Sequence, residues 1–226
     1  MPASAATPLR FAINLGNAVL ATRDAQGKPG GLTVELANRL AQALKRNAAF
    51  VTYSTAGNVV ADAGKDIWDI AFLAIDPKRE ALLNFTAPYI TIQGTLLVRA
   101  QSHWQCVGEM DKPGVVINVG QNAAYDLWLT RELRHATLNR LASSQAAIDA
   151  FLQGVGDMAA GIRQPLEKAA QDNAGFRVLA DDFTQIQQSI AVANSDSRYF
   201  AAITAQLAQW QNDGSLADII AKHITR

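Results

Sequence analysis

The sequence predicts an α/β protein built from two βαβ-type blocks, at about residues 9–98 and 103–186. Short apolar runs typical of buried strands alternate with segments of helical periodicity, and this alternation favours parallel strands flanked by helices. Each block also has enough apolar residues for a core of its own. The helical segment at residues 197–224 follows both blocks, and we expect it to pack on the first of them.

The first block begins with an apolar run closed by Gly16, which predicts a buried strand at residues 9–16. Glycines and a proline at residues 24–32 then predict turns. Leucines spaced four residues apart form one apolar stripe of an amphipathic helix: Leu32, Leu36, Leu40 and Leu44. The remaining segments are expected to be a strand at 48–54, a short helix with a turn at Gly64, and a strand at 68–75.

The second block follows a connecting run at residues 85–101, in which Ala87–Pro88 predicts a turn before a long strand. A strand, Gly120 and a helix bearing Leu127, Leu129 and Leu133 are expected within residues 114–136. The later segments predict a helix, a glycine turn, a buried strand and another helix at 145–172, then two strands at 176–194. Two final helices are separated at Asp213–Gly214.

Charge and composition exclude several functions. The chain has 20 Lys and Arg residues against 20 Asp and Glu residues, so no net field draws it to nucleic acid or to anionic lipid. No apolar run approaches the roughly 20 residues that cross a bilayer. The single cysteine, Cys106, cannot form an intramolecular disulfide. We interpret it as an incidental or partly buried thiol, not as a nucleophile paired with His103.

The first residues, MPASAATPL, lack the basic start and apolar segment of a secretory signal. They look like an initiator Met placed before the small-residue tail of a processed precursor. We therefore expect a mature chain from which a targeting peptide has been removed.

Two connections between the blocks predict a two-lobed chain with a two-segment hinge. Lobe one is expected to comprise residues 1–98 and 194–226, and lobe two residues 99–193. The hinge strands are expected near 93–101 and 186–194. In two-lobed α/β proteins the ligand binds in the cleft between the lobes, so we expect the site there.

Several segments in sequence order resemble the solute-binding proteins of ABC transporters for polar amino acids, which have the type II periplasmic-binding fold. The most specific is KDIWDIAFLAIDPKREALLNFTAPYI, with Trp-Asp, an apolar strand, Arg79 and a Phe-Thr-x-Pro-Tyr ending. GKPGGLTVELANRLAQAL, VGQNAAYDLWL and WQNDGSLADIIAKH resemble other segments of this family. The resemblance therefore covers nearly the whole chain.

This resemblance implies a periplasmic monomer that captures a small carboxylate-bearing solute, an amino acid or a related organic acid, and delivers it to an ABC permease. Arg79 matches the arginine that grips the ligand's carboxylate, and a planar, permanently charged guanidinium suits two parallel hydrogen bonds. Backbone amides near Ala74 and at the helix start formed by Ala123 and Ala124 are expected to add donors. Asn17 and Phe72 complete the residues expected on the lobe-one side.

The chain departs from the family pattern at several of these positions. Ala74 and Asp76 stand where hydroxyl residues are usual, and we interpret Asp76 as the cap of the following turn. Asn122 replaces a hydroxyl residue in the lobe-two loop. It either offers its side-chain amide or adopts a left-handed turn conformation. The segment at Asn17 lacks the usual aromatic lid.

The most informative departure is Ile162, which stands where amino-acid binders carry the aspartate for the ligand's ammonium. Desolvating an unpaired ammonium costs several kcal/mol. The ligand is therefore expected to lack a free α-ammonium, or to place it on a different acceptor. Arg163 comes next. It either faces the site and binds a second acidic group, or is a solvent-facing charge after a buried strand.

Two alternative functions use the same scaffold. A dehydratase-like enzyme needs a general acid in the site, but residues 159–164 carry no carboxylate. No Ser-His-Asp, metal-ligand or phosphate-loop pattern occurs, and the three histidines are scattered: His103, His135 and His223. We therefore expect a binding protein without catalytic residues, metal or cofactor. The second alternative is the ligand-sensing domain of a signalling receptor, which requires fused transmembrane segments.

Overall fold

The computed structural model describes residues 7–224, and the chain divides into two compact units. Unit 1 is Met1–Tyr89 with Gln188–Arg226, and unit 2 is Ile90–Gln187. The chain passes from one unit to the other within two long strands, β6 (Leu83–Arg99) and β11 (Thr184–Ala193). The boundaries expected from the sequence, at 98/99 and 193/194, fall later along the same strands. Because neither strand turns where one unit ends, no local sequence signal marks the boundary. Most of the small-residue start of the chain lies outside the described residues.

The sheet of unit 1 has the strand order β4-β1-β5-β11. β1 (Leu9–Asn14) lies between β4 (Ala48–Tyr53) and β5 (Ile70–Ala74) and is parallel to both. β11 is antiparallel to β5. A small hairpin of β2 (Thr22–Arg23) and β3 (Pro29–Gly30) occupies the segment for which turns are predicted. The three parallel strands therefore all end at one edge of the sheet.

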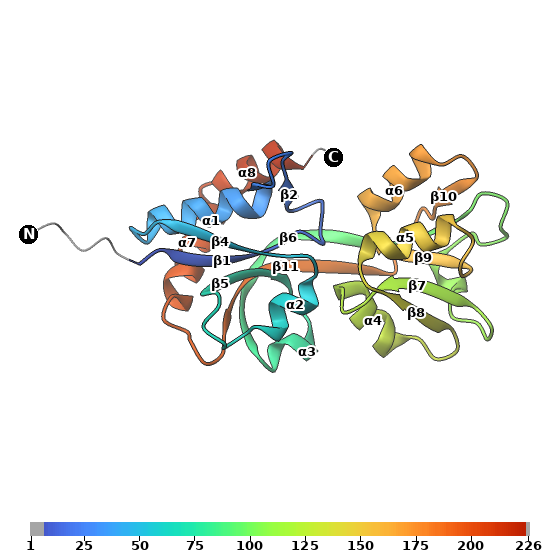
Figure 1. Cartoon of the computed structure of the whole chain (residues 1–226), viewed down its shortest axis with the longest axis horizontal. Coiled ribbons are helices and arrows are strands. Elements are labelled where there is room, and N and C mark those ends of the chain that lie inside the picture. Colours follow the sequence, from blue (N-terminus) through green and yellow to red (C-terminus); the bar gives the residue numbers. More distant parts are fainter. Residues whose placement is uncertain (1–6, 225–226) are drawn as a thin grey trace, which may run out of the picture. The chain divides into compact units, whose positions relative to one another are not determined.

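Helices cover both faces of this sheet (Figure 1). On one face lies α1 (Leu32–Ala43), and its predicted leucine stripe is confirmed for Leu32, Leu36 and Leu40, which are all buried. The fourth predicted member, Leu44, is the C-cap of the helix and is only partly buried. The final helices, α7 (Phe200–Asn212) and α8 (Ser215–His223), contact α1, so the expectation that they pack on the first block is also confirmed. The other face carries α2 (Ala56–Ala61) and the short α3 (Pro77–Glu80).

Unit 2 repeats this scheme. β7 (Val116–Gly120) lies between β8 (Thr137–Leu141) and β9 (Met158–Ile162) and is parallel to both. β6 pairs in antiparallel fashion with β9 and with β10 (Phe176–Val178). In Figure 1, α4 (Ala124–Glu132) lies on one face of these strands, and α5 (Ser144–Leu152) and α6 (Arg163–Asp172) on the other. A 3₁₀ turn, η1 (Val107–Glu109), follows the exposed Cys106. The predicted α/β class with mainly parallel strands is confirmed.

The turn predicted at Ala87–Pro88 is wrong. β6 runs through both residues as one strand of 17 residues. Pro88 has no N–H to donate, but its carbonyl oxygen accepts a hydrogen bond from Gln211 Nε2 at 3.1 Å. A proline is tolerated in a strand where no ladder hydrogen bond needs its N–H, so Pro88 does not end β6.

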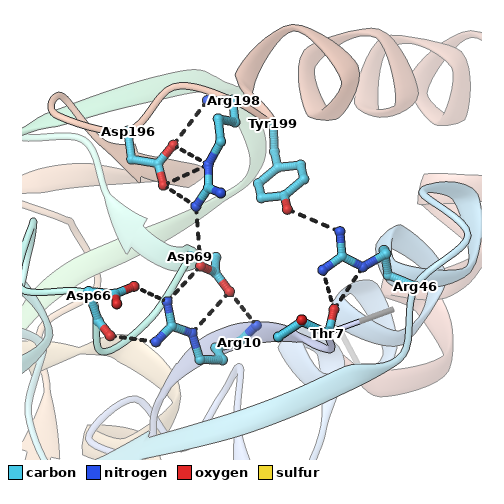
Figure 2. Close-up of polar contacts among 8 residues, drawn as sticks. All are labelled: Thr7, Arg10, Arg46, Asp66, Asp69, Asp196, Arg198 and Tyr199. Carbon is cyan, nitrogen blue, oxygen red and sulfur yellow. Dashed lines mark hydrogen bonds and ion pairs between the residues drawn. The ribbon is translucent and has the colours of Figure 1, made fainter. Parts of the chain in front are cut away.

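A network of ion pairs lies beside the amino ends of β1 and β5 (Figure 2). We name it the amino-edge network, and its members are Arg10, Asp66, Asp69, Asp196 and Arg198. Asp69 lies at its centre with 10% of its side chain exposed. It accepts hydrogen bonds from Arg10 N at 2.8 Å, Nε at 3.2 Å and Nη2 at 2.8 Å. Burial favours a higher pKa for Asp69, but the hydrogen bonds and charge of Arg10 outweigh it and hold this pKa below its usual range.

Glu35 on α1 ties the C-terminal helix α8 to unit 1. Its carboxylate accepts a hydrogen bond from Lys222 Nζ at 2.8 Å and lies 2.6 Å from His223 Nε2. Arg39 Nη2 donates to the same group at 2.8 Å. The hydrogen bonds from Lys222, His223 and Arg39 together lower the pKa of Glu35 from its ordinary value of 4.5 to about 2.

This shift predicts a defined acid sensitivity. A carboxyl group whose pKa is lowered by folding stabilises the fold above its unfolded pKa, and that contribution is lost as the pH falls through the folded value. Between pH 4.5 and about pH 2, the wild-type chain should therefore lose more free energy of unfolding than Glu35→Gln. Urea denaturation across this range measures the difference. Glu132→Gln, an exposed substitution on α4, is the control and should follow the wild-type profile. Parallel profiles for wild type and Glu35→Gln would contradict the assignment.

Candidate functional site

In each unit, the segments that follow the parallel strands leave the sheet at one edge. In unit 1, residues 15–17 follow β1 and residues 75–79 follow β5, its direct neighbour. In unit 2, residues 121–124 follow β7 and residues 163–164 follow β9, which are also neighbours. Ligands of α/β proteins bind at the carboxyl ends of the strands, and most of the predicted site residues lie in these segments or at the strand ends beside them.

α3 positions Arg79 at this edge of unit 1. Asp76 is the N-cap of the helix and accepts a hydrogen bond from Lys78 N at 2.8 Å, so the predicted cap is confirmed. Pro77 follows at the first helical position, where its missing N–H costs nothing. The short helix then turns Arg79 back toward the end of β5, where its Nη1 donates to the carbonyl oxygen of Ala74 at 3.0 Å.

Arg79 is a buried positive charge. The residue is only 3% exposed, and Asp76 beside it is buried to the same extent. Burial lowers the pKa of the Arg79 guanidinium to about 10, and the charge of Asp76 acts in the opposite direction. Arg79 therefore stays protonated at neutral pH. Inside unit 1, the carbonyl oxygen of Ala74 and the negative charge of Asp76 both stabilise this buried cation.

The other two unit-1 residues of the predicted site differ in placement. Asn17 lies in the segment after β1 and forms a turn, because its Oδ1 accepts from Val19 N at 3.3 Å and its carbonyl oxygen from Leu20 N at 3.1 Å. Phe72 packs inside the unit, with its ring 6.3 Å from that of Phe11 and 6.0 Å from that of Tyr89. The structure thus places Asn17 at the carboxyl edge. Phe72 belongs to an aromatic row of the core, which consists of Phe11, Phe72 and Tyr89.

In unit 2 the start of α4 forms the corresponding edge. Asn122 adopts a left-handed backbone with φ of 60°, which agrees with one of the two interpretations of this residue. Its N–H donates to Asp126 Oδ2 at 2.8 Å. Ala123 is the N-cap of α4, and no side chain within residues 7–224 caps the helix there. The first N–H groups of α4, including that of Ala124, have no acceptor within the helix and favour an anion.

Arg163 is fixed within unit 2. Its Nε donates to Asp182 Oδ1 at 3.2 Å, its Nη1 to the carbonyl oxygen of Leu179 at 3.1 Å, and its Nη2 to that of Ala180 at 3.1 Å. Only 16% of the side chain is exposed. Arg163 therefore holds the segment before β11 against the start of α6 and does not lie free in solvent. Ile162 is the N-cap of α6 and is partly buried.

Two buried side-chain polar atoms within the described part of the chain have no hydrogen-bond partner: Tyr89 OH and Gln164 Oε1. Sequence reasoning missed both, because a buried orphan atom is a property of tertiary packing. Tyr89 lies on β6 in the aromatic row with Phe72. Gln164 is the second residue of α6 and lies at the carboxyl edge of unit 2. The one available signal was a polar side chain directly after a buried strand.

Among residues 7–224, no group of three or more His, Cys, Asp or Glu side chains is placed to hold a metal ion. Within the same residues, no helix is both long and apolar enough to span a bilayer.

The sequence profile of the bacterial extracellular solute-binding proteins, family 3, matches residues 9–226. No curated protein sequence matches the chain. Solved structures with the same fold include a protein described as a binding component of an ABC transporter from Wolinella succinogenes, complexed with lysine. It is 22% identical, with a TM-score of 0.82 over 97% of this chain and 96% of that one.

Two further solved structures show how widely the fold is used. The ancestral amino acid-binding protein AncCDT-1, a precursor of cyclohexadienyl dehydratase, is 20% identical with a TM-score of 0.81, over 96% of each chain. A histidine kinase sensor domain with similarity to periplasmic binding proteins is 18% identical with a TM-score of 0.83, over 96% of this chain and 95% of that one. At these identities the likeness establishes the fold alone.

Proposed function

Because the chain belongs to the bacterial extracellular solute-binding proteins of family 3, we propose that it captures a small carboxylate-bearing solute and delivers it to an ABC permease. The proposed compartment is the periplasm, reached after removal of a targeting peptide. The proposed solute is an amino acid or a related organic acid.

The observation that supports this proposal most is the buried guanidinium of Arg79. It is held at the end of β5 by the carbonyl oxygen of Ala74 and keeps its charge at neutral pH. A guanidinium can donate two parallel hydrogen bonds to one carboxylate, and such charge-assisted pairs are about twice as strong as neutral ones. A solute carboxylate at Arg79 would add two such bonds to the interactions that Ala74 and Asp76 already provide.

We further propose that the start of α4 donates to the solute from unit 2. Its first N–H groups, which have no acceptor within the helix, and the positive end of its helix dipole suit an anionic or strongly polar acceptor. Ala123 has no side-chain hydroxyl, so recognition here rests on the backbone. Asn122, which directly precedes Ala123, has a left-handed backbone.

A thermal-shift panel tests the proposal. The chain is first unfolded and refolded to remove any solute that co-purifies with it. It is then heated with amino acids and simple organic acids, each beside its primary amide. A ligand that binds only the folded chain stabilises it by about 2.7 kcal/mol at 100 times its dissociation constant, which is a measurable rise in Tm. We expect the rise with at least one acid and not with its amide. Equal shifts for acid and amide, or no shift with any acid, would refute the proposal.

A further inference from the structure

Gln164 presents a buried acceptor that the described part of the chain leaves unused. Its Oε1 atom is buried and has no hydrogen-bond partner. An unsatisfied buried oxygen destabilises a fold, so native proteins retain one chiefly where a ligand or an ordered water meets it. The atom therefore marks a place where a donor from outside the chain is expected.

The position of Gln164 in the fold favours the solute as the source of that donor. Gln164 is the second residue of α6, which begins directly after β9. β9 runs parallel to β7, with Asn118 paired to Ala159, so the ends of both strands reach the same edge of the unit-2 sheet. The start of α6 thus lies at the edge where α4 begins. Tyr89 OH, the other unpartnered atom, belongs instead to the aromatic row of unit 1.

The charges around Gln164 disfavour an ammonium as the donor. The first turn of α6 carries the positive end of the helix dipole, which repels a cation. Arg163 adds a second positive charge one residue away, although Asp182 and Glu167 pair with it. Ile162, two residues before Gln164, is apolar. An amide oxygen in such surroundings is suited to an uncharged donor.

We propose that the side-chain oxygen of Gln164 accepts a hydrogen bond from an uncharged hydroxyl group of the solute. The solute is then a carboxylic acid that carries a hydroxyl substituent, and not a simple α-amino acid. This inference rests on the proposed function, because it assigns a second recognition group to the same solute.

Calorimetric titration with matched acids tests the inference. One series is propionate, lactate and alanine, and the other is glutarate, 2-hydroxyglutarate and glutamate, so that only the substituent at C2 changes. In at least one series, the affinity of the wild-type chain for the hydroxy acid should be at least tenfold higher than its affinity for the unsubstituted acid or for the amino acid. Gln164→Leu should remove the preference for the hydroxy acid, and Gln164→Glu should move it toward the amino acid.

Two outcomes of these titrations would overturn the inference. One is a wild-type chain that favours the amino acid or shows no preference in either series. The other is a Gln164→Leu variant that keeps the wild-type preference. The variant Arg79→Gln distinguishes a failure of this inference from a failure of the proposed function. Arg79→Gln should weaken the binding of every acid in a series, whereas Gln164→Leu should change only the order of their affinities.

The solute-free protein provides a further readout. Because Oε1 has no partner to lose, Gln164→Leu should keep or raise the Tm of the solute-free chain. Tyr89→Phe is the matched control, since it removes the other unpartnered atom while keeping the ring contact with Phe72. It should leave the ranking of the acids unchanged. A fall of several degrees for Gln164→Leu alone would show a structural role and overturn the inference.

Discussion

Replacing Arg79 by alanine is expected to weaken binding of the carboxylate solute by at least about 100-fold, or roughly 2.7 kcal/mol. The residue is buried, so the solute's carboxylate would lose its charged partner in a place that water reaches poorly. Removing one member of a buried, hydrogen-bonded charge pair costs about 2–5 kcal/mol or more. Calorimetry with the acid identified by the thermal-shift panel measures the loss.

Two further variants test whether the loss of affinity is specific to the guanidinium of Arg79. Arg79→Lys keeps the charge but not the planar fork, so its affinity should lie between those of wild type and Arg79→Ala. Arg39→Ala removes an exposed arginine on α1 and should bind as wild type does. Comparable affinity for wild type and Arg79→Ala would show that the guanidinium does not contact the solute.

The second large effect is expected on stability, at the amino-edge network. Asp69→Ala should lower the free energy of unfolding by about 2–3 kcal/mol, because it leaves the Arg10 side chain and Arg10 N–H without their shared acceptor. The estimate is below that for a fully buried pair because 31% of the Arg10 side chain is exposed. Urea denaturation at neutral pH measures the change.

Asp66→Asn is the matched control for this effect, because asparagine tolerates the left-handed backbone of this residue, with φ of 56°. Asp66 also pairs with Arg10, at 2.6 Å, but 90% of its side chain is exposed. Exposed pairs contribute about 0–1 kcal/mol, so this variant should lose much less stability than Asp69→Ala. Equal losses for the two variants would show that burial of Asp69 does not set the strength of the network.

The elements with strong local patterns could be predicted from the sequence. The leucine stripe of α1 dictates which face is buried, and Asp76 with Pro77 marks the start of α3. Pro88 misled the prediction, because whether a proline ends a strand depends on whether a neighbouring strand needs its N–H. The unit boundaries gave no signal, because β6 and β11 continue across them.

The candidate site was predictable to the extent that it depends on residue type. Arg79 is conspicuous because a cation follows a buried apolar strand. In contrast, β5 is apolar at every position, so the sequence does not reveal which of its side chains enter the core, and Phe72 packs there. The partners of Arg163 lie at residues 179–182, and only the fold brings them to α6. The burial of Gln164 Oε1 likewise arises from packing.

A crystal structure of the chain with a bound acid tests the central claim most directly. We expect the solute's carboxylate oxygens at about 2.7–2.9 Å from the guanidinium nitrogens of Arg79, the range of charge-assisted hydrogen bonds. A solute bound elsewhere, with the Arg79 side chain paired only to groups of the protein, would contradict it.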